Sequence, residues 1–194
     1  SGRGPALSVR TAAGGRMGFN GTTADKYAAF PAPCSAKAGS CARALLEGAD
    51  DPDLDPLTRP FRWGATVRVT KAQLSGSANI VQKGVADTDS QWKLQIGANR
   101  GKAHCVVVGQ GGAATIYLVR SSTGIADGAW HEVTCERSGT RLSVHVDGRE
   151  QGSRTIPASL SIANSLPLRI GGPNFAATSD MYHGLLDDVY ARLG

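Results

Sequence analysis

Four cysteines carry the clearest chemical signal in this sequence. They lie at positions 34, 41, 105 and 135, without a C-x-x-C pair and without histidines at zinc-finger spacing, so disulfides fit better than a metal site. Cys34 and Cys41 share one loop, whereas Cys105 and Cys135 each lie inside an alternating apolar run. Of the three connectivities that four cysteines allow, we therefore expect Cys34 with Cys41 and Cys105 with Cys135. Two disulfides indicate an oxidising compartment and a secreted protein.

Other chemical patterns each fail at a required position. Three aspartates in segment 50–56 match the first ligands of an EF-hand loop, but Pro56 stands where that loop needs glycine and Arg62 where it needs glutamate. A solvated turn is the better interpretation. The glycine-rich stretch 109–114 is followed by a strand pattern instead of the helix that a dinucleotide-binding turn requires. The four histidines show no metal-binding spacing and no G-x-S-x-G motif occurs, so no nucleophile and base can be assigned.

The elements that would position functional residues are clearest between Trp130 and Gly148. Apolar and polar residues alternate over 132–136 and again over 142–146, and Gly139 lies in the short polar turn between these runs. This pattern predicts an antiparallel hairpin with one apolar face. Such a face must be covered by a second layer of structure.

Further alternating or apolar runs recur along the chain, separated by turns rich in glycine and aspartate. They lie at 61–70, 79–83, 91–96, 103–108, 115–119, 166–170 and 184–191. This rhythm of short strands predicts a β-sandwich or barrel, with Trp63 in its core. Residues 41–47 fit one or two helical turns or a strand, and the residue pattern alone leaves both open.

Length and composition favour one secreted domain. At 194 residues, 17–194 fits a single sandwich domain, and 1–16 reads as a loosely tied segment in which 6–9 is compatible with a short edge strand. The net charge of +5 comes without a basic run, so we expect no nucleic-acid partner. No stretch is long and apolar enough to span a membrane, and the absence of an apolar leader after Ser1 predicts a signal peptide already removed.

Several segments together resemble a laminin-G-like, concanavalin A-like jelly-roll domain of secreted bacterial proteins. They read FNGTTADKY, DDPDLDPLTRPF, WHEVTCERSGTRLSVHVDG, LPLRIGG and HGLLDDVYARL, and they follow the family's order from residue 19 to 193. The resemblance implies two stacked antiparallel sheets and a strand over 42–47. It also implies a recognition module that binds carbohydrate or a protein surface and often adjoins a catalytic domain.

A structural calcium ion is a second implication of this resemblance. Carried over residue by residue, its ligands would be Asn20, Asp25 and Asp187, completed by backbone carbonyls near Gly21. Asp187 also needs a partner on physical grounds, because it shares a strand face with apolar neighbours. The alternative is that Asp187 accepts hydrogen bonds from a neighbouring turn and Asp25 forms an Asx turn.

Enzymes on scaffolds that resemble this one use a Glu-x-Asp-x-Glu strand to cut β-glucans. The nearest match here is Glu132 to Glu136, with Thr134 in place of the aspartate. Residues four apart on a strand lie about 13 Å apart, which is too far for a retaining pair unless both side chains lean together. Trp130 and His131 match a family Trp-His pair, and we interpret them as packing and rim hydrogen bonding.

A bound glycan would need an aromatic platform flanked by amides and charges. Tyr117 is expected to point away from the core, and Phe175 and Tyr182 lie in loops before the last strand pattern. The polar candidates are Lys83, Gln95 and Arg120. The sequence therefore favours a secreted, non-catalytic recognition module of unspecified oligomeric state, with a glycan hydrolase or lyase and a structural or adhesion domain as alternatives.

Overall fold

The computed structural model describes residues 4–22, 25–34, 41–87, 89–110, 115–175 and 180–194. These residues form two seven-stranded sheets, and the paired strands among them run antiparallel. The first sheet contains, in spatial order, β1 (Leu7–Ala12), β4 (Arg43–Gly48), β13 (Leu168–Ile170), β6 (Ala78–Gly84), β7 (Gln91–Gly97), β8 (Lys102–Val108) and β9 (Tyr117–Gly124). The second contains β12 (Arg149–Thr155), β11 (Arg141–Val146), β10 (Asp127–Ser138), β5 (Phe61–Thr70), β14 (Leu185–Leu193), β3 (Lys26–Ala29) and β2 (Gly18–Gly21).

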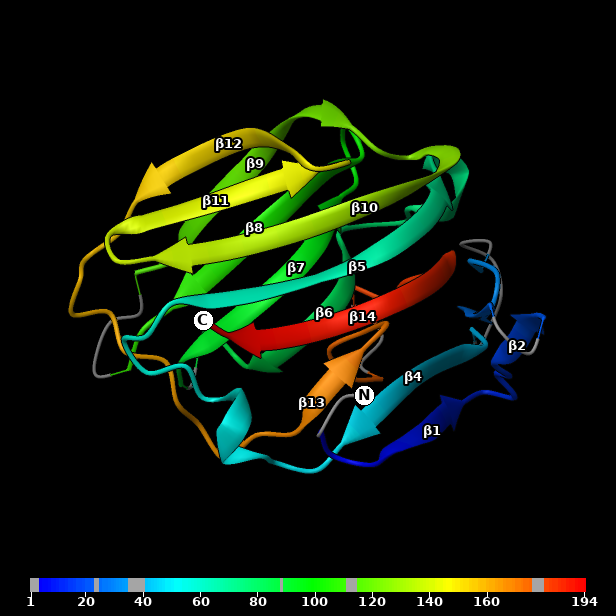
Figure 1. Cartoon of the computed structure of the whole chain (residues 1–194). Coiled ribbons are helices and arrows are strands. Elements are labelled where there is room, and N and C mark those ends of the chain that lie inside the picture. The colour runs from blue at the N-terminus through cyan, green and yellow to red at the C-terminus, as the bar shows by residue number, and fades with distance from the viewer. Residues whose placement is uncertain (1–3, 23–24, 35–40, 88, 111–114, 176–179) are drawn as a thin grey trace.

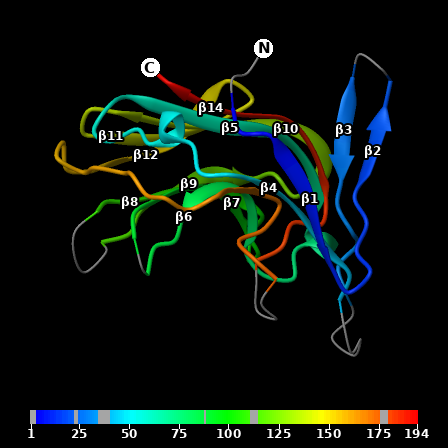
Figure 2. The ribbon, with the colours of Figure 1, turned by 90° about the horizontal axis from the view of Figure 1, so that it is seen from below.

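The two sheets face each other and enclose one apolar core, as the alternating patterns predicted. Figure 1 shows β10, β5 and β14 in front of the first sheet, and Figure 2 shows the two layers edge-on with the β2–β3 hairpin beside them. Trp63, predicted as core, is fully buried and lies 5.2 Å from the ring of Phe61 and 6.0 Å from that of Trp92. Aromatic rings from both sheets thus fill the centre of the sandwich.

Both predicted disulfides are confirmed. Cys105 of β8 and Cys135 of β10 join the two sheets through the core, with their Cα atoms 5.5 Å apart. Cys34 and Cys41 close the loop before β4, with Cα atoms 5.4 Å apart. The described residues contain no free cysteine.

Most local elements follow the predicted patterns, whereas β12 is a strand that no sequence pattern predicted. The hairpin of β10 and β11 pairs Val133 with Val146, and residues 43–48 form a strand, as the family resemblance implied. Residues 7–12, within the segment expected to be loosely tied, pair with β4 along their whole length as the edge strand β1. Residues 7–12, which overlap the edge strand allowed at 6–9, are therefore part of the first sheet.

Two single-turn 3-10 helices complete the described structure. They are η1 (Pro52–Leu54) and η2 (Lys71–Gln73). In η1, Asp51 caps the turn by accepting a hydrogen bond from the backbone of Asp53 at 3.0 Å, and Leu54 is buried. The acidic segment thus forms a turn, as predicted. The carboxylates of Asp50 and Asp55 also pair with the buried Lys83.

Candidate functional site

A continuous polar row crosses four strands of the first sheet. In β7 the side chains of Trp92, Leu94 and Ile96 point into the core, so Gln95 points outward, away from the second sheet. The strand register then places Gln95 opposite Asn79 of β6 and His104 of β8. Because directly opposite residues share one face of a sheet, these side chains lie side by side on the outer face.

Arg120 of β9 ends this row, because it lies opposite His104. Gln82 and Lys93 form a second pair on the same face, one step further along the strands. Asn79 donates a hydrogen bond to Gln82 at 2.6 Å. We call the row Asn79, Gln95, His104 and Arg120, together with Gln82 and Lys93, the outer polar face.

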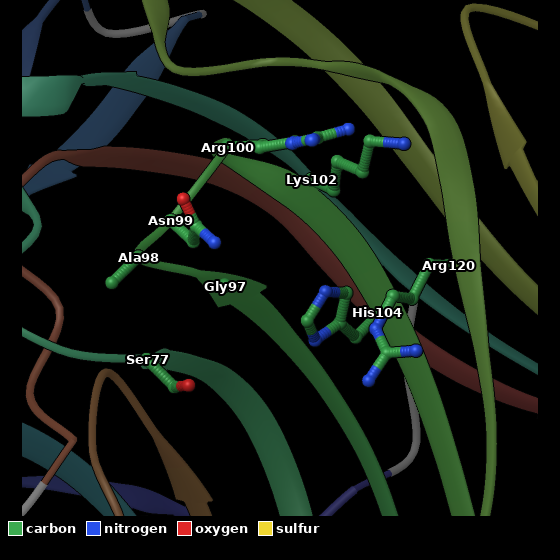
Figure 3. A pocket seen from close by; sticks show the side chains of 8 residues that line it. All are labelled: Ser77, Gly97, Ala98, Asn99, Arg100, Lys102, His104 and Arg120. Carbon is green, nitrogen blue, oxygen red and sulfur yellow. The ribbon is translucent and has the colours of Figure 1, made fainter.

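A pocket of about 470 Å³ opens at the Arg120 end of the outer polar face (Figure 3). Its lining comes from the residue before β6, the end of β7, the turn that follows, and the strands β8 and β9. The lining residues are Ser77, Gly97, Ala98, Asn99, Arg100, Lys102, His104 and Arg120. Gly97 is required here, because a Cβ at this position would collide with the imidazole of His104. The glycine lets that ring lie against the backbone of β7.

The pocket is strongly electropositive. Burial lowers the pKa of His104 to about 4, and the neighbouring charges of Arg120, Lys93 and Lys102 act in the same direction. His104 is therefore neutral at pH 7. The side-chain amide of Gln95 approaches Nδ1 of His104 at 3.3 Å and donates to it, which leaves the imidazole proton on Nε2. The ring thus presents a donor toward the pocket side of the row.

Lys93 and Asp180 titrate away from their ordinary ranges beside this face. Burial lowers the pKa of Lys93, with Asp180 and Asp87 opposing that shift. Burial raises the pKa of Asp180, with Lys93 opposing it. The loops that contain Asp87 and Asp180 therefore border the outer polar face and supply its nearest carboxylates.

Of the predicted ligand-binding residues, only Gln95 and Arg120 lie on the outer polar face. The prediction for Lys83 is corrected, because its side chain is fully buried and its ammonium pairs with Asp55 at 2.6 Å and Asp50 at 2.9 Å. Tyr182 is also fully buried, and its hydroxyl donates to backbone carbonyls of Arg68 and Leu185. Neither side chain is available to a ligand.

The two remaining aromatic candidates lie elsewhere. Tyr117 was expected to point outward, but it packs against the core on the same side of β9 as the buried Val119. The guanidinium of Arg154 lies 5.3 Å from its ring centre. Phe175 is half-buried, and Arg43 both donates to its carbonyl and covers its ring at 5.9 Å. No aromatic side chain lines the pocket among the described residues.

The predicted calcium ligands are spread over two elements. Asn20 and Asp25 are exposed at the end of the β2–β3 hairpin, whereas Asp187 is half-buried in β14. The Oδ1 of Asp187 accepts a hydrogen bond from the backbone of Asp188 at 2.8 Å. Across the described ranges, no three His, Cys, Asp or Glu side chains gather as a metal site. The calcium ion therefore stays a prediction that the donor set does not by itself support.

The carboxylates of the hydrolase alternative lie on the outer face of the second sheet. Glu136 accepts a hydrogen bond from Arg62 at 2.9 Å, and Thr134 is hydrogen-bonded to the hydroxyl of Tyr190 at 2.6 Å. Glu132 is exposed. An ion pair therefore engages one of the two carboxylates.

Trp130 and His131 lie at the rim of the second sheet. His131 bonds Asp147 at 2.8 Å and Asp127 at 3.1 Å, which is the rim hydrogen bonding that we expected. Trp130 meets the ring of Tyr27 edge-on at 5.7 Å, and 38% of its surface stays exposed. Trp130 is thus a surface residue packed on one side only.

Two stacked antiparallel sheets with a polar outer face place the chain among the lectin-type jelly-roll sandwiches. Residues 51–191 match the laminin G family model described as the concanavalin A-like lectin/glucanases superfamily, and the chain belongs to this family. No curated protein matches the sequence. No helix in the described ranges has the length and apolar character needed to cross a membrane.

Solved structures of several other proteins share this fold. One is domain 4 of AbnA, a GH43 extracellular arabinanase from Geobacillus stearothermophilus, in complex with arabinotriose (TM-score 0.70, 16% identity, 97% of this chain and 82% of that chain). A second is the binding domain of botulinum neurotoxin DC in complex with SialylT (TM-score 0.63, 10% identity, 97% and 43%). A third comprises domains LG4-5 of the mouse laminin alpha1 chain (TM-score 0.53, 18% identity, 83% and 44%). At these identities the likeness establishes the fold alone.

Proposed function

We propose that this domain is a secreted, non-catalytic carbohydrate-recognition module that binds glycan on the outer polar face. The observation that carries the proposal is the register that aligns Asn79, Gln95, His104 and Arg120 across four neighbouring strands. Neighbouring strands lie about 4.8 Å apart, so the row sets polar groups at regular short intervals. Asn79 and Gln95 are buried and support the row, whereas the half-buried His104 and the exposed Arg120 are the members that a sugar can reach. Sugars present many hydroxyl groups that both donate and accept, and such a row matches them.

Two further observations support a glycan as the ligand. The pocket of about 470 Å³ beside the row falls within the roughly 300–1,000 Å³ typical of ligand clefts. Two solved domains with the same fold are in complex with arabinotriose and with SialylT. The two disulfides support an extracellular location, where glycans are exposed.

A glycan array followed by calorimetry tests the proposal. Gln95→Met keeps the size of the side chain but removes the hydrogen bond that orients His104, and Glu132→Gln on the opposite sheet is the control. We expect the array to identify at least one glycan, and Gln95→Met to weaken its binding about three- to tenfold, because a neutral hydrogen bond contributes roughly 0.5–1.5 kcal/mol. Glu132→Gln should bind normally.

The proposal fails if no glycan binds, which would favour the structural or adhesion alternative. It also fails in its placement of the site if Gln95→Met binds as tightly as the unchanged protein. Activity that cleaves a bound glycan, and that Glu132→Gln abolishes, would favour the hydrolase or lyase alternative instead.

A further inference from the structure

The pocket beside the outer polar face gathers positive charge without any negative partner. Arg100, Lys102 and Arg120 line it together with His104, and no aspartate or glutamate belongs to the lining. Figure 3 shows Arg120 beside His104 at one end of the pocket, and Arg100 and Lys102 toward the other end. The cations thus come from a turn and two strands and surround one space.

These three cations differ from the ion-paired cations of the molecule. Elsewhere a carboxylate pairs with Arg10, Arg62, Lys83, Arg141 and Arg169. Throughout the described residues, by contrast, Arg100, Lys102 and Arg120 have neither a hydrogen-bonded nor an ion-paired partner. Like charges that are brought together without a counter-charge raise the local positive potential. A bound anion would lower it.

The state of His104 agrees with this uncompensated potential. After burial, the main causes of its lowered pKa are the charges of Arg120, Lys93 and Lys102. These charges face His104 from β9, from β7 and from its own strand β8. The imidazole therefore stays neutral and acts as a hydrogen-bond donor beside the charged groups.

From this cluster we infer that the pocket binds the anionic group of an acidic glycan, a carboxylate or a sulfate, held by Arg120, Lys102 and Arg100. The inference rests on the proposed function and names its ligand class. The guanidinium of Arg120 offers a planar pair of donors that fits a carboxylate or sulfate bidentately. His104, held by Gln95, would then donate to a hydroxyl group of the same sugar chain.

Matched pairs of glycans test the inference by calorimetry. Each pair differs in one anionic group: 3′-sialyllactose against lactose, 3′-sulfated lactose against lactose, and an oligogalacturonate against its methyl ester. We expect at least one acidic member to bind about tenfold more tightly than its neutral counterpart. Its affinity should fall between about 0.05 and 0.5 M salt, whereas neutral binding should not change. The pairs distinguish a carboxylate from a sulfate.

Variants assign this charge effect to the pocket. Arg120→Gln should weaken binding of the acidic member more than binding of its neutral counterpart and so reduce the preference, and Arg120→Lys should restore part of the difference. The control Arg62→Gln removes the same charge from the second sheet and should keep the full preference. Thermal unfolding of each variant checks that Arg120→Gln is folded, as expected for an exposed side chain.

Three outcomes would overturn the inference. If every pair binds equally, or only neutral members bind, the pocket does not select an anion, although the proposed function stands. If Arg120→Gln and Arg62→Gln weaken acidic binding equally, the attraction is general and not local. If no glycan of either kind binds, the proposed function itself fails, and the inference fails with it.

Discussion

At the scale of single residues, Lys83 shows how a small irregularity decides the role of a side chain. Strict alternation from the outward Asn79 would place Lys83 outward too. A β-bulge shifts the register between Asn79 and Val81, and Lys83 consequently lies opposite the core residue Trp92. Its ammonium is then paired with Asp50 and Asp55, because a buried charge needs such partners. The carboxylates of the acidic loop before β5 therefore neutralise a buried ammonium group.

His131 should make the stability of the domain depend on pH. Burial opposes its charged form, but hydrogen bonds to Asp147 and Asp127 outweigh this effect and raise its pKa. Because the pKa of His131 is higher in the folded than in the unfolded protein, its protonation stabilises the fold fully below about pH 6.5, the unfolded pKa. This stabilisation is lost as the pH rises through the folded pKa. We therefore expect the thermal midpoint to decrease from pH 6 toward pH 8.5 in the unchanged protein.

His131→Gln should flatten that decrease. The difference should amount to a few °C, because one such ion pair contributes at most about 1 kcal/mol and 1 kcal/mol shifts Tm by roughly 2–4 °C at this size. His145→Gln is the matched control and should keep the decrease. An unchanged pH profile in His131→Gln would show that the Asp127 and Asp147 contacts contribute nothing to stability.

At the scale of elements, strands and the central hairpin could be predicted because their signals are local. Alternation over 132–136 and 142–146 needs no information from distant segments, and the same holds for the buried run of β8. The facing of β9 was predicted wrongly, because Tyr117 and Val119 pack inward while the more apolar Ile116, directly before the strand, is 48% exposed. Hydrophobicity alone misplaced that strand's inner face.

The outer polar face could be found only in part. Gln95 and Arg120 were candidates for their residue types, but His104, Lys102 and Arg100 were not. No short spacing joins them, since the pocket depends on the register of β7, β8 and β9. The outward position of His104 between the buried Ala103 and Cys105 was the one sequence signal available. Using this signal would have required knowing that β8 pairs with β7 and β9.

The β2–β3 hairpin carries the calcium prediction. If Asn20, Asp25 and Asp187 bind calcium, it should tie this hairpin to β14 and raise the thermal midpoint. A calorimetric titration with calcium, repeated on Asp187→Asn, measures this directly. The alternative is that the hydrogen bond from the backbone of Asp188 already satisfies the Asp187 carboxylate. In that case neither protein gives a heat of calcium binding, and calcium leaves Tm unchanged.

At the scale of the whole molecule, the two layers are joined covalently as well as by their core. The Cys105–Cys135 bridge closes a loop with a sequence separation of 30, and chain-entropy reasoning gives it about 3 to 4 kcal/mol of stabilisation. The Cys34–Cys41 bridge spans only 7, which gives it roughly 2 to 3 kcal/mol.

Replacing each pair of cysteines by alanine tests this ranking. Urea denaturation should show the larger loss of unfolding free energy for Cys105→Ala with Cys135→Ala, because that pair also leaves a cavity between the sheets. The double variant with Cys34→Ala and Cys41→Ala is the control, because it loses the bridge in the loop before β4 instead of the one between the sheets. Equal losses would mean that the bridge through the core does not constrain the unfolded chain as its longer loop predicts.

The bridge through the core also determines how the domain responds to tension. If β1 and β14 were pulled apart, strands could peel away up to the two sulfur atoms, but the backbone between them would stay closed. That segment corresponds to a contour length of roughly 100 Å that tension cannot extend. Arg120 lies inside it, and His104 directly precedes it. A domain attached to a surface under flow would thus keep part of its pocket wall connected while its outer strands yield.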